Sequence, residues 1–281
     1  MRPVNLADRV AQFDWYHTIE LPGGVVTPGH FDTVRERARL PLPDRLDGMR
    51  CLDVGTCDGF WAFELERRGA REVIGIDLDD LTRVDWPGNT PLERIQDVAA
   101  QPGRRRAAFE LVRDALGSRV ERRSLSVYEL DPEDIGIFDF VFIGSILSML
   151  RDPVGALEGI RRVLRGQLLS VDLISPRLTL AHPRQPIARL EAQGYYLWWV
   201  MNLAAYRRLF DAAGYRTVAA GRPFRLHAGP GFILTTPRGN GPLGRLLQRV
   251  PRHLGVPSAW VLASSEEPTP RDSIAAGGGG D

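Results

Sequence analysis

Two short stretches of the sequence carry residues typical of a ligand-binding site. The first, Cys51 to Gly59, reads Cys-Leu-Asp-Val-Gly-Thr-Cys-Asp-Gly and precedes a helix-like run that begins at Phe60. A strand, a turn bracketed by Gly55 and Gly59 and a following helix bring backbone N–H groups and a helix N-terminus close to a ligand. The pattern therefore predicts a βα turn that binds a small molecule; the alternative is a purely structural turn.

The second stretch, Val73-Ile74-Gly75-Ile76-Asp77, ends in an acid 22 residues after Gly55. An acid at the end of the next strand can accept hydrogen bonds from ribose hydroxyls, which indicates a nucleoside-containing ligand. Cys57 stands where the dinucleotide pattern Gly-x-Gly-x-x-Gly has its middle glycine. A nicotinamide dehydrogenase is therefore less favoured than another nucleoside-binding enzyme.

The surrounding elements alternate between strand and helix patterns. Periodicity predicts strands near 51–54, 73–77, 124–130, 138–145, 168–174 and 215–220, with helices at 60–65, 104–116, 153–164 and 203–213. Alternating strands and helices favour an α/β fold with a doubly wound parallel sheet. Such a sheet binds its ligand at the carboxyl ends of the strands.

Three regions are expected from this layout. Residues 1–48 form an N-terminal cap or lid segment, residues 49–265 the ligand-binding domain, and residues 266–281, with four consecutive glycines, a disordered tail. The last strand is either Phe232–Thr236 or Ala259–Ala263, and the later segment is favoured. Residues 221–257 would then be a lid excursion between the last two strands.

The two ligand-binding stretches, with Trp15-Tyr16-His17-Thr18-Ile19 before them, resemble class I S-adenosylmethionine (SAM)-dependent methyltransferases. The similarity covers residues 13–220 and is greatest to the branch related to tRNA wobble-uridine (5-hydroxyuridine) modifying enzymes. It implies the class I fold, which is an α/β, Rossmann-like fold with a doubly wound, mostly parallel seven-stranded sheet, and it implies SAM as cofactor. It also implies the contacts with SAM. The methionine part would be contacted by Asp53, Gly55, Thr56, Cys57 and Gly59, and the ribose by Asp77 and Leu78. The adenine would be contacted by Ser126 and Val127, and the sulfonium by Ser145.

One departure from that branch bears on the reaction. The carboxymethyl-transferring members use carboxy-SAM and carry Tyr-His after the fourth strand, where this sequence has Ser148-Met149, and they use a lysine that this chain lacks altogether. Ordinary SAM is therefore expected. The net charge of +1 also differs from the basic footprint of an obligate tRNA-binding protein. A tRNA-modifying methyl- or carboxymethyltransferase and a non-enzymatic binding protein stay as alternatives.

The expected reaction is methyl transfer to a hydroxyl of a small-molecule or glycan acceptor. Such a reaction benefits from a base, and histidine is the natural one near neutral pH. We take His17 as the first candidate and His182 as the second, while a lid histidine that only positions its loop is the alternative for His17. Candidate acceptor contacts are Tyr16, His30, Trp198, Trp199 and Asn202.

Composition sets the remaining expectations. The chain is 43% hydrophobic and 25% charged, which is ordinary for a soluble globular protein. Its two cysteines, Cys51 and Cys57, are expected to be reduced, and no cysteine–histidine spacing indicates a metal. We find no signal-peptide core and no apolar run long enough to cross a membrane, so a cytoplasmic protein is expected. The sequence leaves the oligomeric state open.

Overall fold

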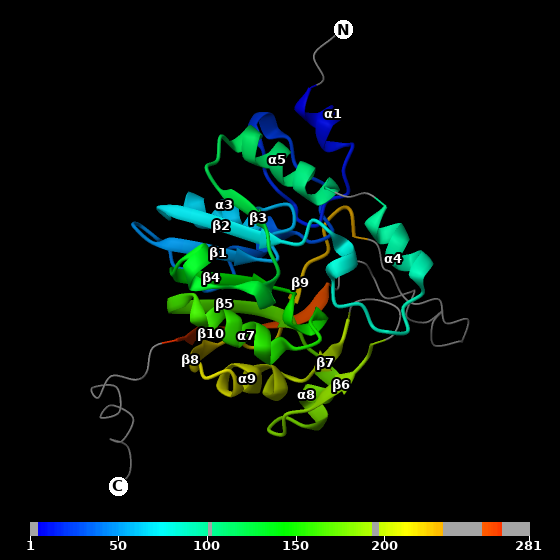
Figure 1. Ribbon diagram of the computed structural model, residues 1–281, viewed down its shortest axis with the longest axis vertical. Helices are drawn as coiled ribbons and strands as arrows, with labels where there is room; N and C mark the ends of the chain where they lie inside the picture. The colour runs from blue at the N-terminus through cyan, green and yellow to red at the C-terminus, as the bar shows by residue number, and fades with distance from the viewer. Residues whose placement is uncertain (1–4, 101–102, 193–196, 233–254, 266–281) are drawn as a thin grey trace.

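A twisted sheet runs through the middle of the molecule (Figure 1). The computed structural model describes residues 5–100, 103–192, 197–232 and 255–265, and within these ranges the sheet has eight strands. Their order is β3 (Glu121–Ser124), β2 (Glu72–Asp77), β1 (Arg50–Val54), β4 (Phe138–Gly144), β5 (Leu164–Leu173), β10 (Val256–Ser264) and β8 (Arg216–Ala220), and β9 (Phe224–Leu226) also pairs with β10.

The strands from β3 to β5 pair in parallel, whereas β10 lies antiparallel between β5 and β8. The sheet order reverses between β1 and β4, since the chain leaves β1 toward β2 and returns on the other side through β4. Such a reversal opens a crevice at the carboxyl ends of the strands, where α/β proteins bind ligands. The predicted α/β sheet is confirmed, including its mostly parallel strands.

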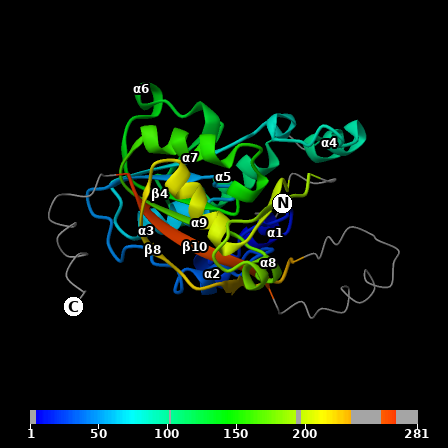
Figure 2. The ribbon, with the colours of Figure 1, turned by 90° about the horizontal axis from the view of Figure 1, so that it is seen from below.

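Helices cover both faces of the sheet. One face is packed by α6 (Pro132–Ile135), α7 (Pro153–Arg162) and α9 (Leu203–Ala212), and the other by α3 (Phe60–Arg67), α5 (Arg104–Leu116) and the N-terminal segment. Figure 2 shows α9 on one side of β10 and α2 (Thr33–Glu36) on the other. Alternation along β1 divides its residues between these two cores: Leu52 and Val54 face α7, while Cys51 faces α3.

Helix ends follow the local sequence. Gly103 and Gly117, both at positive φ, bound α5, and Asp152 followed by Pro153 begins α7 with a side-chain cap on the Gly155 N–H. The remaining short elements are α1 (Leu6–Val10), η1 (Pro22–Gly24), η2 (Leu81–Arg83), α4 (Leu92–Ala99), η3 (Val127–Glu129), η4 (Leu147–Met149), α8 (Pro176–Ala181), β6 (Ala188–Leu190) and β7 (Trp199–Met201).

Two of the expected elements were wrong. The third strand ends at Ser124, and the expected strand continuation to residue 130 is the 3-10 helix η3. Ser126 and Glu129 form a capping box there, which favours a helical turn over an extended chain. Residues 78–100, where no helix or strand was expected, contain η2 and α4, and Figure 1 shows α4 projecting beyond the sheet.

The last strand lies in the later of its two candidate segments. β10 spans Val256–Ser264 and includes the expected Ala259–Ala263, whereas residues 233–236 of the earlier candidate lie outside the described residues. Most of the expected excursion over 221–257, and the tail from 266 onward, also lie outside them. No helix in the described part of the chain is long and apolar enough to cross a membrane.

Candidate functional site

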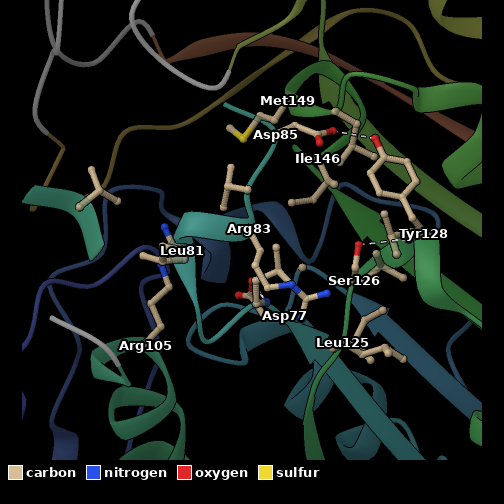
Figure 3. Close-up of a pocket in the computed structure, with 18 residues that line it drawn as sticks. Asp77, Leu81, Arg83, Asp85, Arg105, Leu125, Ser126, Tyr128, Ile146 and Met149 are labelled. Atoms are coloured by element: carbon tan, nitrogen blue, oxygen red, sulfur yellow. Dashed lines mark hydrogen bonds between the residues drawn. The ribbon is translucent and has the colours of Figure 1, made fainter. Parts of the chain in front are cut away.

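A cavity opens at the carboxyl ends of β1, β2 and β3, beside the point where the sheet order reverses (Figure 3). Including its mouth and the open solvent there, the empty space amounts to about 770 Å³. Its lining is mostly apolar with a few polar groups: Val54, Gly55, Ile76, Asp77, Leu78, Leu81, Arg83, Val84, Asp85, Val98, Arg105, Leu125, Ser126, Val127, Tyr128, Ile146, Met149 and Leu150.

The turn after β1 forms one wall of this cavity and depends on its glycines. Gly55 has φ +77°, and a Cβ there would lie 2.5 Å from Ile146 Cδ1. Gly59, at φ +95°, begins α3 with its Cα against Phe63 and Phe109, where a Cβ would come within 2.6 Å of both rings. A larger residue at either position would be strained and would clash. Gly55 therefore keeps the cavity open, and Gly59 lets α3 start close to α5.

Asp77 faces the cavity from the end of β2, as the sequence predicts. Its Oδ2 accepts the Cys57 N–H at 2.9 Å and its Oδ1 accepts the Leu78 N–H at 2.8 Å. A carboxylate has about four acceptor sites, so each oxygen keeps one for another donor. The geometry suits a pair of ribose hydroxyls, and Leu78 lines the cavity beside it.

Ser126 and Val127 line the opposite wall, although they belong to η3 rather than to a strand. The Ser126 hydroxyl accepts the Tyr128 N–H at 3.3 Å, so it is occupied in capping η3. Leu125, Val127 and Ile146 make this part of the cavity apolar, as a flat aromatic base requires. Figure 3 shows Ser126 and Leu125 across the cavity from Arg105.

Asp53 and Thr56 lie deeper than the cavity wall. Asp53 points to the α3 side of β1, where it is 1% exposed and its Oδ2 accepts the Ala62 N–H at 3.1 Å. Burial raises the pKa of Asp53 to about 6. Thr56 packs over Gly75, whose missing side chain makes room for it. Asp53 thus supports the start of α3 beneath the turn, and the structure does not bring its carboxylate into the cavity lining.

The N-terminal segment, residues 5–48, named the lid below after its expected role, contacts the same turn through Asp58. Asp58 is 2% exposed; its Oδ2 accepts the N–H groups of Tyr16 at 2.8 Å and of His17 at 3.0 Å, and its Oδ1 pairs with His17 Nδ1. His17 is 4% exposed and its ring lies 5.8 Å from that of Phe60. Sequence reasoning missed Asp58, because its partners are more than 40 residues away in the chain.

Tyr16 and Ser145 face each other between the lid and the end of β4. Burial raises the pKa of the Tyr16 phenol well above its ordinary value, with the Ser145 hydroxyl acting in the opposite direction, so Tyr16 stays protonated near neutral pH. Ser145 has φ +56°, in the left-handed region. The Tyr16 ring packs edge-on against His17 at 4.9 Å, and His30 lies beside it at 6.4 Å.

Two of the predicted acceptor and base residues, Asn202 and His182, do not line the cavity. Asn202 is fully buried at the N-terminus of α9; its Oδ1 accepts the N–H groups of Ile187 and Ala205, and its Nδ2 donates to the carbonyls of His182 and Gln185. Its amide has no capacity left for a substrate. The His182 side chain is exposed at the end of α8 and does not line the cavity.

Trp198 and Trp199 fix the β6–β7 hairpin to the cavity rim. Trp198 Nε1 donates to the Asp85 carbonyl at 2.6 Å, with the Arg151 guanidinium 5.2 Å from its ring centroid, and Trp199 Nε1 donates to the Arg151 carbonyl at 3.3 Å. Asp85 in turn accepts the Tyr128 O–H at 2.7 Å. Asp85 and Tyr128 were not predicted, because no element was expected around Asp85 and a strand was expected over 124–130, where Tyr128 lies in η3.

The two cysteines, Cys51 and Cys57, are free thiols within the described part of the chain. Burial raises the pKa of Cys51 to about 12, so it is an uncharged core thiol. The described residues contain no group of three or more histidine, cysteine, aspartate or glutamate side chains that could hold a metal ion.

Comparison with known proteins identifies the family. The model of a family described as "Methyltransferase domain" matches residues 31–220, well over half of the chain. The chain belongs to this family. The match is to methyltransferases as a group, so the wobble-uridine branch stays a prediction.

The individual relatives agree with this assignment at low identity. The chain is 26% identical over 160 residues to the ribosomal protein L11 methyltransferase of Aquifex aeolicus (strain VF5). The match covers 56% of this chain and 65% of the relative's length, so the chain spans just under two thirds of that relative. The N-terminal domain of EvdMO1, solved with S-adenosylhomocysteine (SAH) and D-fucose, is 16% identical with a TM-score of 0.54, covering 95% of this chain and 98% of that domain. It shows the shared fold.

A further solved structure extends the same comparison. The 1,6-didemethyltoxoflavin-N1-methyltransferase of Burkholderia thailandensis, with its substrate and SAH bound, is 17% identical with a TM-score of 0.43, covering 79% of this chain and 72% of that one. Family and fold together make this protein a class I SAM-dependent methyltransferase, with SAM as its cofactor. The residues present fit that cofactor: an acid with free acceptor sites stands beside apolar walls.

Proposed function

We propose that this methyltransferase transfers the methyl group of SAM to a hydroxyl of a small-molecule or glycan acceptor. The observation that carries the proposal is the His17–Asp58 pair, because it supplies an oriented base in the segment that covers the turn after β1. SAM supplies an already activated methyl group when bound. The chain's own residues therefore have to hold the acceptor in line and take its proton.

His17 has the features of an oriented base. We assign the proton to Nδ1, because the Asp58 carboxylate accepts there. That tautomer leaves the Nε2 lone pair available for the proton of an acceptor hydroxyl, and the carboxylate stabilises the imidazolium that forms. Two backbone hydrogen bonds to the same carboxylate hold the His17 main chain and that of Tyr16. The ring therefore keeps one orientation.

The cofactor site is proposed in parts. Asp77 would bind the ribose hydroxyls through its free acceptor sites, and Val127, Leu125 and Ile146 would hold the adenine between apolar walls. The backbone of residues 55–57 would lie along the methionine part, with Ser145 near the sulfonium. The Ser148-Met149 pair and the absence of lysine favour SAM over carboxy-SAM.

The acceptor is proposed to lie under the lid, where Tyr16 and His30 present one aromatic and one imidazole ring close together. A protonated phenol and a ring face suit a sugar or phenol hydroxyl. The structural relative EvdMO1 was solved with D-fucose, which supports including sugars among the candidates.

A tRNA acceptor gains little support from the described surface. Arg104, Arg106, Arg113, Arg119, Arg122 and Arg123 each lie within 4 Å of an acidic side chain. Their charge is therefore balanced locally rather than presented as a basic face for phosphates. Residues 245–252, the other arginine-containing segment considered, lie outside the described residues.

The first experiment is calorimetric titration with SAM, SAH, carboxy-SAM and NAD. Binding of SAM and SAH without preference for carboxy-SAM supports ordinary methyl transfer, whereas a preference for carboxy-SAM overturns it and favours the tRNA acceptor. SAH release from SAM is then measured against panels of sugars, phenols and unmodified tRNA. Release with tRNA alone would contradict a small-molecule acceptor.

The second experiment tests the base with whichever acceptor the panel gives. His17→Gln should lower kcat by about 10²–10⁴-fold, the usual contribution of general base catalysis, while the Kd of SAH changes little. The matched variant His182→Ala, on the exposed end of α8, should keep its activity. Full activity in His17→Gln would remove His17 from the chemistry and leave it a positioning role.

A further inference from the structure

Asp58 joins two parts of the site that are far apart in the sequence. It belongs to the turn after β1, yet its carboxylate accepts the N–H groups of Tyr16 and His17 and pairs with the His17 ring, all in the lid. The group is 2% exposed, so each of these bonds is sheltered from water. Replacing it by an apolar side chain would leave two buried backbone N–H groups without this acceptor.

The same turn is tied to the predicted ribose acid. Cys57 N–H donates to Asp77 Oδ2, and Cys57 directly precedes Asp58 in the chain. Cys57 itself has φ +51°, a conformation that a non-glycine residue adopts only when its surroundings hold it. A continuous series of contacts therefore connects the Asp77 carboxylate to the lid through the strained Cys57–Asp58 backbone.

We propose that Asp58 is a positioning residue that couples cofactor binding at Asp77 to the placement of Tyr16 and His17. A ligand that engages Asp77 holds the Cys57–Asp58 backbone in one conformation, and Asp58 then holds the lid in the arrangement described here. The inference rests on the proposed function for the role given to Tyr16 and His17. The coupling between Asp77 and the lid requires only that the cofactor binds at Asp77.

The lid has a second anchor that supplies a matched control. Glu36 is fully buried, and its Oε1 accepts the His227 N–H at 3.0 Å and pairs with His227 Nδ1. Both acids thus bind one histidine ring and its backbone N–H, but the contacts of Glu36 are with His227 and not with the turn after β1. Loss of either anchor loosens the lid; only loss of Asp58 uncouples it from the cofactor.

Hydrogen exchange of the full-length protein, with and without saturating SAH, tests this difference. In the wild type, SAH should slow exchange at residues 15–20 by about fivefold or more, the lower end of allosteric coupling factors. Asp58→Ala should lose this response, and Glu36→Ala should keep it. Asp58→Asn retains an oxygen that can accept the two backbone N–H groups, so it should keep most of the response.

Binding supplies an independent readout, because coupling is reciprocal. Asp58→Ala should therefore weaken the Kd of SAH, by up to the factor by which SAH protects the lid in the wild type. Exchange in α7 and β5 monitors whether each variant is folded. An SAH response in Asp58→Ala as large as in the wild type, or its loss in Glu36→Ala, would overturn the proposal.

Failure of the proposed function gives a different result. A wild type that binds SAH and protects the lid but methylates no hydroxyl keeps the coupling and removes the acceptor assignment. A wild type that binds SAH without protecting the lid overturns the coupling and leaves the acceptor assignment standing.

Discussion

The two ends of the cofactor site are held by different kinds of interaction. Beneath and beside the turn after β1, buried carboxylates accept backbone N–H groups: Asp53 from Ala62, and Asp58 from Tyr16 and His17. At the adenine end, partly exposed side chains bind one another, as in the Arg83–Glu129 ion pair and the Tyr128–Asp85 hydrogen bond. We propose that one cofactor lies between the two ends, of which only the first is sheltered from water.

This contrast predicts where substitutions matter. When a buried carboxylate loses its donors, or the donors lose their carboxylate, the remaining group stays buried without a partner. Its desolvation is then not compensated, and the free energy of unfolding falls. An exposed ion pair contributes about 0–1 kcal/mol, since water and salt replace either partner. The turn after β1 should therefore be sensitive to every change, and the rim of the cavity should tolerate many.

The largest effect expected at the buried end is a pH dependence of stability from Asp53. Burial raises its pKa in the folded state to about 6, above the value of about 4 in an unfolded chain. Between these two pKa values the folded state holds a proton that the unfolded state has lost, so the free energy of unfolding falls as pH rises. The full loss, reached above pH 6, is about 3 kcal/mol.

Urea unfolding of the wild type and Asp53→Asn at pH 4 and pH 8 isolates this contribution. The amide side chain of the variant keeps an oxygen for the Ala62 N–H but does not ionise. Because the unfolded-state carboxyl is already about half ionised at pH 4, the advantage of Asp53→Asn over the wild type should grow by about 2 kcal/mol from pH 4 to pH 8. A difference that stays constant with pH would mean that Asp53 titrates as in the unfolded chain.

Asp77 stands between the two ends and should give the next largest effect, on binding. Asp77→Ala removes the acceptor of the Cys57 N–H and the proposed ribose contacts. The Kd of SAM and SAH should rise at least tenfold, or about 1.4 kcal/mol, by calorimetry. Asp80→Ala, which removes an exposed carboxylate that only caps η2, should stay within about twofold of the wild type. Equal affinities in all three proteins would show that the ribose binds elsewhere.

The buried end is also the part of the site that the sequence predicts best. Gly55 and Gly59 could be recognised because only glycine readily adopts positive φ at a tight βα turn, and Asp77 because it ends an apolar strand. These signals are local. Asp58 has no local signal, since its partners Tyr16 and His17 approach it only after the lid has folded over the sheet.

Two predictions were wrong because neighbouring residues in the sequence favoured two different structures. Ser126 and Glu129 have the spacing of a capping box, yet the apolar residues between and after them resemble a strand, and the helical turn prevails in the structure. Asn202 lies next to an aromatic pair, which suggested a substrate contact, but it also precedes a helical pattern as an N-cap residue should. In both places the hydrogen-bonding capacity of the backbone decided the outcome.

Tyr128→Phe tests the contrast between the buried and the exposed ends of the proposed site, at its adenine end. The Tyr128 hydroxyl donates to Asp85 Oδ2 at 2.7 Å and accepts the Asp152 N–H at 3.2 Å, and the side chain is 37% exposed. Its loss should lower the free energy of unfolding by about 1 kcal/mol, because water can replace part of the bond. The Kd of SAH should rise by a small factor, since the ring itself still lines the cavity.

Tyr206→Phe is the matched variant for this measurement. Its buried hydroxyl donates to Ser170 Oγ at 2.8 Å, away from the cavity lining. Its removal should cost at least as much stability as Tyr128→Phe and leave the affinity for SAH unchanged. A larger binding defect in Tyr206→Phe than in Tyr128→Phe would contradict the assignment of the adenine wall to η3.

The smallest effect is expected at Arg83, whose ion pair with Glu129 crosses the rim of the cavity. The two side chains are 46% and 48% exposed, so their coupling energy in a double-mutant cycle of Arg83→Gln and Glu129→Gln should be about 0.5 kcal/mol or less. Raising the salt concentration should reduce it further. The cycle is needed because Glu129 also accepts the Ser126 N–H in the capping box, a contact that Glu129→Gln alone would mix with the ion pair. An SAH affinity that falls tenfold in Arg83→Gln alone would mean that Arg83 binds the cofactor directly, and the adenine end would then depend on charge as much as the turn after β1 does.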